Sequence, residues 1–300
     1  MKTIVVFGAS GQQGGGVVRA LKAQGMFRVR AVSRDTARLA GLGADEVVSA
    51  DLTRAETLGP AFDGAHGAFV VTNFWEGPGI DELAQGRAAV DAARAAGVQH
   101  FIWSTLPNVA VLSDDAFDVP HFTQKARVDA LVSKAGFPAY TFVEPPFYFQ
   151  NLTGQMTPQP QADGSKGWVM PMAPDSRVIH AGDVSELGTV VAGAFANPDR
   201  VGAGQHLALS GDLLSWNDIV KTLRDQGHNV QFQPVPGEVF DTFFPQAPEL
   251  RKMMNYFEAH TYFGPDADEK IALAREVATA TPTSFADWAR VNFAQDRVAQ

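Results

Sequence analysis

The chain has 300 residues, of which 45% are hydrophobic and 19% charged, and it contains no cysteine. This composition is typical of a globular protein of one large or two small domains, and it excludes disulfides and thiolate metal sites. A formal net charge of −9 argues against general nucleic-acid binding, which needs a basic surface. We find neither a long apolar run nor a secretory signal pattern, so we expect a cytoplasmic protein without membrane spans.

The chain opens with an apolar strand at residues 3–7, which leads into a glycine-rich turn and a helix at residues 12–24. The turn reads Gly8-Ala9-Ser10-Gly11-Gln12-Gln13-Gly14. Its glycines allow a tight turn and a close approach of the backbone to a ligand, and the helix N-terminus offers N–H donors to a pyrophosphate. Strand, Gly-x-x-Gly-x-x-Gly and helix in this order predict a dinucleotide-binding site.

Strands and helices alternate through the first 145 residues. Further strands are predicted at 28–33, 45–49, 68–72, 98–104 and 139–144, and further helices at 80–96 and 121–135. Strands joined by helices of this length pair in parallel through right-handed crossovers. We therefore predict an α/β fold with a doubly wound parallel Rossmann sheet in a domain of residues 1–150.

The composition changes after Glu144. Residues 145–175 are rich in Pro, Gly, Gln and Met and show weak periodicity. Ordered segments are predicted at 177–180, 184–196, 206–210 and 215–223. Ser215 is expected to cap the helix of the last segment. An aromatic stretch at 240–263 is expected to supply helices that cover a cleft. We expect a smaller, interleaved C-terminal α/β domain at 151–300, with a soft boundary and some segments that return to the Rossmann part.

The end of the second strand indicates which nicotinamide cofactor is bound. An acidic residue there marks NAD, whereas this chain has Ser33 and Arg34. A guanidinium can pair bidentately with a 2′-phosphate and Ser33 can add a hydroxyl, which favours NADP(H). The alternative is that Arg34 caps a loop or pairs with Asp35. Asp51, after the third strand, is placed either to contact the adenine or to cap the helix near Thr53.

These motifs resemble those of the NmrA-like group of atypical short-chain dehydrogenases/reductases. The resemblance covers most of the chain and is clearest at residues 1–155. It rests on the glycine-rich turn, Ser33-Arg34-Asp35, Val71-Thr72-Asn73-Phe74-Trp75-Glu76, Ser104, His121-Phe122-x-x-Lys125 and Pro146-Phe147-Tyr148-Phe149-Gln150-Asn151. It implies an NADP(H)-binding Rossmann domain with a smaller C-terminal domain that forms a cleft. Relatives include redox-sensing transcriptional co-regulators and NADPH-dependent reductases of quinones, dyes or phenylpropanoid-type compounds.

The resemblance also implies a catalytic helix, in which short-chain dehydrogenases carry Tyr-x-x-x-Lys. None of the four tyrosines here precedes a lysine by four residues, and the equivalent pair is His121 and Lys125. Spacing of i and i+4 places both on one helical face, with Lys125 expected to hold the nicotinamide ribose. For His121, proton transfer and a purely pocket-shaping role stay equal alternatives.

Other candidate residues follow strand ends at the carboxyl edge of the sheet. Ser104 is expected to orient a substrate carbonyl, with turn formation as the alternative. Tyr148 is the best substitute phenol, although packing is the simpler role. Cofactor contacts are expected from Thr72, Asn73, Phe74, Glu144 and Pro145. The histidines show no metal-ligand spacing and the chain has no Gly-x-Ser-x-Gly motif, so we predict neither a metal site nor a hydrolase.

Two functions remain open at this point. The first is an NADPH-dependent reductase of a small quinone, carbonyl or conjugated acceptor, since quinones need less general-acid help than ketones. The second is a non-catalytic NADP(H) redox sensor that regulates a protein partner, with residues 150–175 as the switching element. A structural homodimer with a vestigial cofactor site is a third, weaker alternative. No direct nucleic-acid partner is expected.

Overall fold

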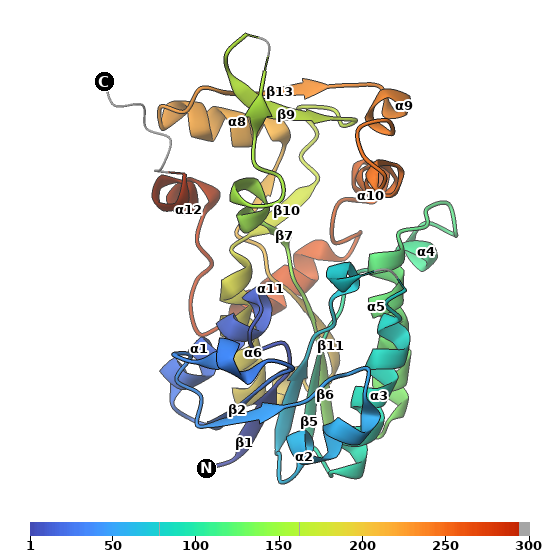
Figure 1. Cartoon of the computed structure of the whole chain (residues 1–300), viewed down its shortest axis with the longest axis vertical. Helices are drawn as coiled ribbons and strands as arrows, with labels where there is room; N and C mark the ends of the chain where they lie inside the picture. Colours follow the sequence, from blue (N-terminus) through green and yellow to red (C-terminus); the bar gives the residue numbers. More distant parts are fainter. Residues whose placement is uncertain (78, 162, 294–300) are drawn as a thin grey trace.

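The computed structural model describes residues 1–77, 79–161 and 163–293 (Figure 1). The predicted domain at 151–300 includes residues 162 and 294–300, and the segment 145–175 includes residue 162; these positions lie outside the described residues. Among the described residues, no helix is both long and apolar enough to cross a membrane.

A parallel sheet of seven strands organises the half of the molecule drawn at the bottom of Figure 1. The strands are β1 (Thr3–Val6), β2 (Arg28–Ser33), β3 (Glu46–Ser49), β4 (Gly67–Val70), β5 (His100–Ser104), β6 (Ala139–Glu144) and β11 (Ala203–Ala208). Their order is β11-β6-β5-β4-β1-β2-β3, and every neighbouring pair is parallel. The strand order reverses at β1, and ligands of doubly wound sheets bind beyond the carboxyl ends of the strands at this reversal.

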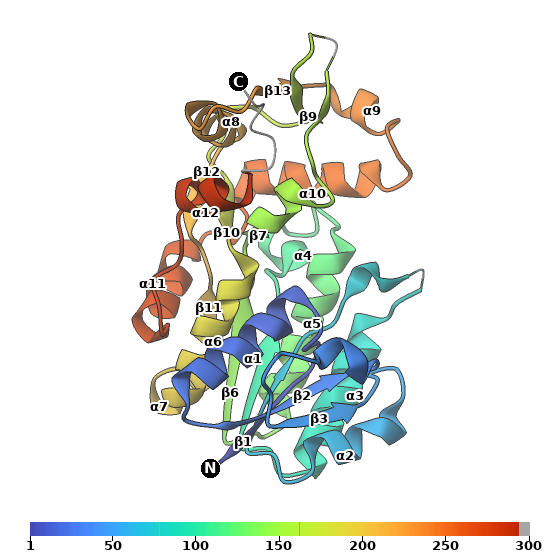
Figure 2. The same cartoon turned by 60° about the vertical axis from the view of Figure 1, so that its left-hand side comes forward.

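Helices cover both faces of this sheet (Figure 2). One face carries α1 (Gln12–Gln24), α6 (Leu187–Ala196) and α11 (Ala267–Val277), and the other carries α2 (Leu58–Phe62), α3 (Glu82–Ala95) and α5 (Pro120–Lys134). Successive side chains of a strand point to opposite faces. Ile4 and Val6 therefore pack under α1 and α6, whereas Val5 and Phe7 pack under α2 and α3.

Two glycines allow α1 and α6 to lie in direct backbone contact. A Cβ atom at Gly16 would lie 2.2 Å from the carbonyl oxygen of Ser185, and one at Gly188 would lie 2.2 Å from that of Gly16. Neither position has room for a side chain. This contact ties a helix from the second half of the chain to the helix that begins at the glycine-rich turn.

The C-terminal part has two small sheets and its own aromatic core. The strands β7 (Phe147–Tyr148), β10 (Ile179–Gly182) and β12 (Asp212–Leu214) form one sheet, and β8 (Gln159–Pro160), β9 (Lys166–Met170) and β13 (Val230–Pro234) form the other. The helices α8 (Trp216–Asp225), α10 (Ala247–His260) and α12 (Phe285–Asn292) pack here. Large buried rings such as Trp168, Trp216 and Phe257 fill the space between these elements.

Short helical turns connect the larger elements. They are η1 (Thr36–Leu39), η2 (Ala55–Thr57), η3 (Phe74–Glu76), α4 (Val109–Leu112), η4 (Phe149–Thr153), η5 (Val184–Glu186), α7 (Pro198–Val201) and α9 (Gly237–Phe240). Of these, η3 follows the carboxyl end of β4, at the edge of the sheet where ligands of doubly wound folds bind.

The predicted fold class is confirmed: the structure is α/β, with a doubly wound parallel sheet and a smaller C-terminal part. The second half also returns to the large sheet, through β11 and α6. The segment 145–175, which shows weak periodicity in the sequence, contributes β7, β8 and β9. The β9 strand pairs in parallel with β13. Its burial does not alternate from residue to residue, and β7 and β8 have two residues each, so these strands leave no period-2 pattern in the sequence.

Candidate active site

The glycine-rich turn connects β1 to α1 and is shaped by its glycines. Gly8 has φ +68°, which a residue with a side chain rarely adopts, and a Cβ at Gly14 would lie 2.2 Å from the Gly8 carbonyl oxygen. Gly11 is the N-cap of α1 and makes no side-chain cap hydrogen bond. The first N–H groups of a helix have no acceptor within the helix, so this turn is suited to bind an anion.

Ser33 and Arg34 lie beside this turn, at the carboxyl end of β2. The hydroxyls of Ser10 and Ser33 are 3.2 Å apart. Arg34 does not pair with Asp35, the alternative considered from the sequence. It donates to both carboxylate oxygens of Glu76 instead, at 2.9 and 2.6 Å. The Asp35 carboxylate caps η1 by accepting from the N–H of Ala37.

Asp51 follows β3 and closes a tight turn. Its carboxylate accepts hydrogen bonds from the N–H and the hydroxyl of Thr53, at 2.9 and 2.8 Å. The helical turn that follows has Arg54 as its N-cap, so Asp51 caps the turn near Thr53 and not a helix. Contact with an adenine stays a prediction for this residue.

Lys125 lies on α5, and its ammonium group is buried against the end of β4. It donates to the carbonyl oxygen of Thr72 at 2.7 Å, to the Thr72 hydroxyl at 2.9 Å and to the carboxylate of Glu82 at 2.6 Å. Burial lowers the pKa of Lys125, and the Glu82 carboxylate opposes that shift. All three ammonium hydrogens thus have acceptors, so a ribose hydroxyl would have to replace one of these acceptors or share a hydrogen with it.

Gln13 links two hydroxyl groups from different parts of the chain. Its amide oxygen accepts from the Ser104 hydroxyl at 2.7 Å, and its amide nitrogen donates to the Tyr148 hydroxyl at 2.7 Å. Burial raises the pKa of Tyr148 to about 12, so the phenol is neutral at physiological pH. Because the Tyr148 oxygen accepts from Gln13, its O–H hydrogen can be donated to a ligand.

His121 occupies the first turn of α5, after Pro120. The rings of Phe74 and Trp75 lie 5.7 and 5.1 Å from its imidazole, centre to centre. Its Nδ1 atom is 3.2 Å from a carboxylate oxygen of Glu249, on α10. His121 and Lys125 share a helical face as predicted, but their polar atoms bond to different neighbours.

The remaining predicted residues have structural partners of their own. The Asn73 side chain caps η3 by accepting from the N–H of Trp75. The buried Glu144 carboxylate pairs with His206 at 2.8 Å and with Lys270 at 3.2 Å, on the side of β11 and α11. Pro145, the next residue, is buried. Cofactor contacts from Asn73, Glu144 and Pro145 stay predictions.

Sequence reasoning missed two carboxylates of this region. Glu82 is fully buried and follows Asp81, the N-cap of α3. The only local feature of the sequence that distinguishes it is that it is an acidic residue at the start of a helix. Glu249 lies 128 residues from His121, and no local pattern connects the two. Both roles depend on the folded chain bringing distant segments together.

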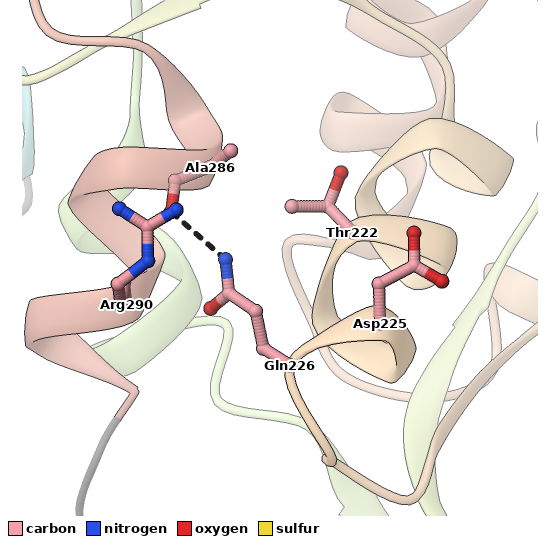
Figure 3. A pocket seen from close by; sticks show the side chains of 5 residues that line it. All are labelled: Thr222, Asp225, Gln226, Ala286 and Arg290. Carbon is pink, nitrogen blue, oxygen red and sulfur yellow. Dashed lines mark hydrogen bonds between the residues drawn. The ribbon is translucent and has the colours of Figure 1, made fainter.

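A hollow of about 480 Å³ lies elsewhere, between α8 and α12 (Figure 3). Thr222, Asp225, Gln226, Ala286 and Arg290 line it, and Gln226 donates to the carbonyl oxygen of Ala286 at 2.8 Å. None of the predicted site residues lines this hollow, so it adds nothing to the chemistry at the carboxyl edge of the sheet. In the described part of the chain, no group of three or more His, Asp or Glu residues is arranged to hold a metal ion.

Comparison with solved structures identifies similar folds. A structure of NmrA, a negative transcriptional regulator in complex with NAD, superposes with a TM-score of 0.78 at 24% identity, covering 97% of this chain and 94% of that one. An NADPH-dependent quinone oxidoreductase from Escherichia coli, solved with NADPH, gives a TM-score of 0.77 at 17% identity, covering 97% and 99%. These likenesses establish the Rossmann architecture.

Sequence comparison establishes the family. An NmrA-like family domain-containing oxidoreductase from Aspergillus hancockii is 30% identical over 308 residues, covering 93% of this chain and 91% of the relative. The model of the NmrA-like family matches residues 1–289. This chain belongs to the NmrA-like family.

Proposed function

We propose that this chain binds NADP(H) across the carboxyl edge of its large sheet and reduces a small quinone, carbonyl or conjugated acceptor. The observation that carries the proposal is the position of Gln13. This residue belongs both to the glycine-rich turn and to the first turn of α1, and its amide is hydrogen-bonded to the hydroxyls of Ser104 and Tyr148. The glycine-rich turn and the phenol proposed to orient the acceptor are thereby joined through one side chain.

The residues at this edge fit a nicotinamide dinucleotide. Gly11 leaves the N-terminus of α1 without a side-chain cap, which suits a pyrophosphate, and the absence of a side chain at Gly14 lets α1 begin directly against the Gly8 carbonyl in a tight turn. Ser33 and Arg34 lie at the end of β2, where the 2′-phosphate of NADP would bind. Bound NADPH would supply the hydride.

The chain itself would stabilise and protonate the acceptor oxygen. As a neutral phenol, Tyr148 would donate a hydrogen bond to this oxygen, and Ser104, which donates its own hydroxyl hydrogen to Gln13, would hold the amide that orients the phenol. His121, as the imidazolium, would give its Nε2 proton to this oxygen and keep the Nδ1–H that the Glu249 carboxylate accepts, which leaves a neutral ring of fixed orientation. Phe74 and Trp75 would wall an aromatic acceptor beside His121.

Relatives support this chemistry. The similar fold from Escherichia coli is named as an NADPH-dependent quinone oxidoreductase, and the fungal relative is named as an oxidoreductase. A quinone also suits a site in which histidine stands at the position of the usual tyrosine, because its reduction needs less acid catalysis.

The test is NADPH oxidation at 340 nm against a panel of quinones, aldehydes, enones and imines, with wild type, His121→Ala and Lys125→Ala. We expect saturable turnover with a quinone, a loss of roughly 10²-fold in kcat for His121→Ala, and little remaining activity in Lys125→Ala. Absence of turnover with every acceptor, alongside tight NADPH binding by calorimetry, would overturn the reductase proposal.

The partners of Lys125 favour a second candidate, a non-catalytic NADP(H) sensor. Its ammonium is already bonded to Thr72 and Glu82, and no tyrosine lies four residues before it. The similar fold NmrA is named a negative transcriptional regulator, and a Neurospora crassa relative is named a nitrogen metabolite repression protein. With a net charge of −9, such a sensor would act through a protein partner. It would bind NADPH and NADP⁺ with different affinities but oxidise no NADPH.

A further inference from the structure

We propose that Glu76 is a specificity-determining residue, which competes with the 2′-phosphate of the cofactor for Arg34 and so reduces the preference for NADP(H) over NAD(H). The inference rests on the proposed binding of the 2′-phosphate at Arg34. Both terminal nitrogens of Arg34 donate to the Glu76 carboxylate, at 2.9 and 2.6 Å. The two residues are 42 positions apart: Arg34 follows β2 and Glu76 ends η3, after β4, so the ion pair spans the carboxyl end of β1, which lies between these strands.

A guanidinium recognises phosphate and carboxylate with the same planar pair of N–H groups. A 2′-phosphate at Arg34 must therefore either displace the Glu76 carboxylate from the guanidinium or lie close to the negative charge of Glu76. Either arrangement makes the free energy of NADP(H) binding less favourable. The 2′-hydroxyl of NAD carries no charge and needs no such exchange. Glu76 thus weakens the binding of NADP(H) while leaving that of NAD(H) nearly unchanged.

Displacement of Glu76 would also change the surroundings of Trp75, the preceding residue of η3. Trp75 is 50% exposed, whereas the other four tryptophans are at most 4% exposed. The Trp75 ring lies 5.1 Å from His121, centre to centre. A change in the exposure of Trp75 that NADP⁺ causes and NAD⁺ does not would therefore indicate that Glu76 leaves Arg34.

Calorimetric titration of NADP⁺ and NAD⁺ into wild type, Glu76→Gln and Arg34→Ala tests the competition. We expect Glu76→Gln to bind NADP⁺ about fivefold more tightly than wild type, as removal of an exposed ionic competitor implies, with NAD⁺ affinity unchanged. Glu56→Gln is the matched control, because it removes the same charge from an exposed ion pair, with Arg54, elsewhere on the surface. It should leave both affinities as in wild type.

The outcomes separate this inference from the proposed function. If Arg34→Ala weakens NADP⁺ binding but Glu76→Gln leaves it unchanged or weaker, Glu76 does not compete and only the inference fails. If Arg34→Ala binds NADP⁺ as well as wild type does, the proposed 2′-phosphate site is wrong and the inference fails with it.

Acrylamide quenching of tryptophan fluorescence gives an independent readout. NADP⁺ should change the quenching of wild type more than NAD⁺ does, and Trp75→Phe should remove this difference. In Glu76→Gln, where no ionic bond to Arg34 has to break, the two cofactors should act alike. Equal effects of NADP⁺ and NAD⁺ on wild type would count against displacement of Glu76.

Discussion

The carboxylate of Glu82 accepts a hydrogen bond of 2.6 Å from the ammonium of Lys125, at a position where the two side chains are 0% and 9% exposed. Glu82 begins α3 and Lys125 lies in the middle of α5, so the ion pair joins two helices on one face of the sheet beside the end of β4. The hydroxyl of Thr72 bridges the two groups, donating to Glu82 and accepting from Lys125.

This buried pair leads to a prediction about stability. Lys125→Met leaves a buried carboxylate without its cation, and we expect it to lower the free energy of unfolding by roughly 3–5 kcal/mol. Replacing both residues, in Glu82→Leu/Lys125→Met, should cost clearly less than the sum of the two single changes. Urea unfolding measures all four proteins, and strictly additive costs would show that the two groups are not coupled.

Tyr148 leads to a prediction about pH. Because burial raises its pKa to about 12, the phenol keeps its proton throughout the range in which an oxidoreductase is assayed. Tyr148→Phe should lower kcat by about tenfold through the loss of one hydrogen bond, without changing the pH profile between about pH 6 and about pH 9. A decline of the wild-type rate within that range that disappears in Tyr148→Phe would mean that the phenol ionises during turnover.

His100 leads to a prediction about acid stability. Burial, assisted by the nearby His66, lowers the pKa of His100 from 6.5 to about 4, while the ring is hydrogen-bonded to Thr141 at 2.9 Å. The unfolded chain binds a proton at His100 more readily than the folded chain does. The contribution of neutral His100 to the free energy of unfolding is therefore complete above pH 6.5 and is lost as the pH falls towards 4. The loss amounts to about 3 kcal/mol at most.

His100→Gln keeps a hydrogen-bond donor for Thr141 but does not titrate. Its free energy of unfolding should therefore depend less steeply on pH in that range than that of wild type. Part of the slope should persist, because burial also lowers the pKa of His180 to about 4. Identical slopes for wild type and variant would contradict the assigned titration.

The local parts of this fold could be predicted from the sequence. The bounds of α1, β2 and β6 agree with their patterns, because each is a short apolar or amphipathic segment bounded by turn residues. Ser215 caps α8 with a capping box, as its side chain suggested. The glycine-rich turn was recognisable because its chemistry is contained in seven consecutive residues.

The parts that depend on distant segments could not be predicted in this way. The pairing of Arg34 with Glu76, of His121 with Glu249 and of Gln13 with Tyr148 joins residues 42 to 135 positions apart. A single sequence shows which side chains can form such bonds but not which partner each will meet. For the same reason the bonds of the Glu144 carboxylate to His206 and Lys270 could not be predicted, while contact of Glu144 with the cofactor stays a prediction.

The most direct test of the account is calorimetric titration of NADPH into wild type, Gly11→Ala and Gly59→Ala. Gly11 has φ −95°, which alanine adopts easily, and its added Cβ would lie 3.3 Å from the Gly8 carbonyl oxygen, at the surface a pyrophosphate would approach. Gly59 is the control, because a Cβ there meets no atom within 4 Å. We predict that wild type and Gly59→Ala bind NADPH equally and that Gly11→Ala binds it at least about tenfold more weakly. Equal binding by all three proteins, or no binding by wild type, would contradict a nicotinamide dinucleotide site on the glycine-rich turn.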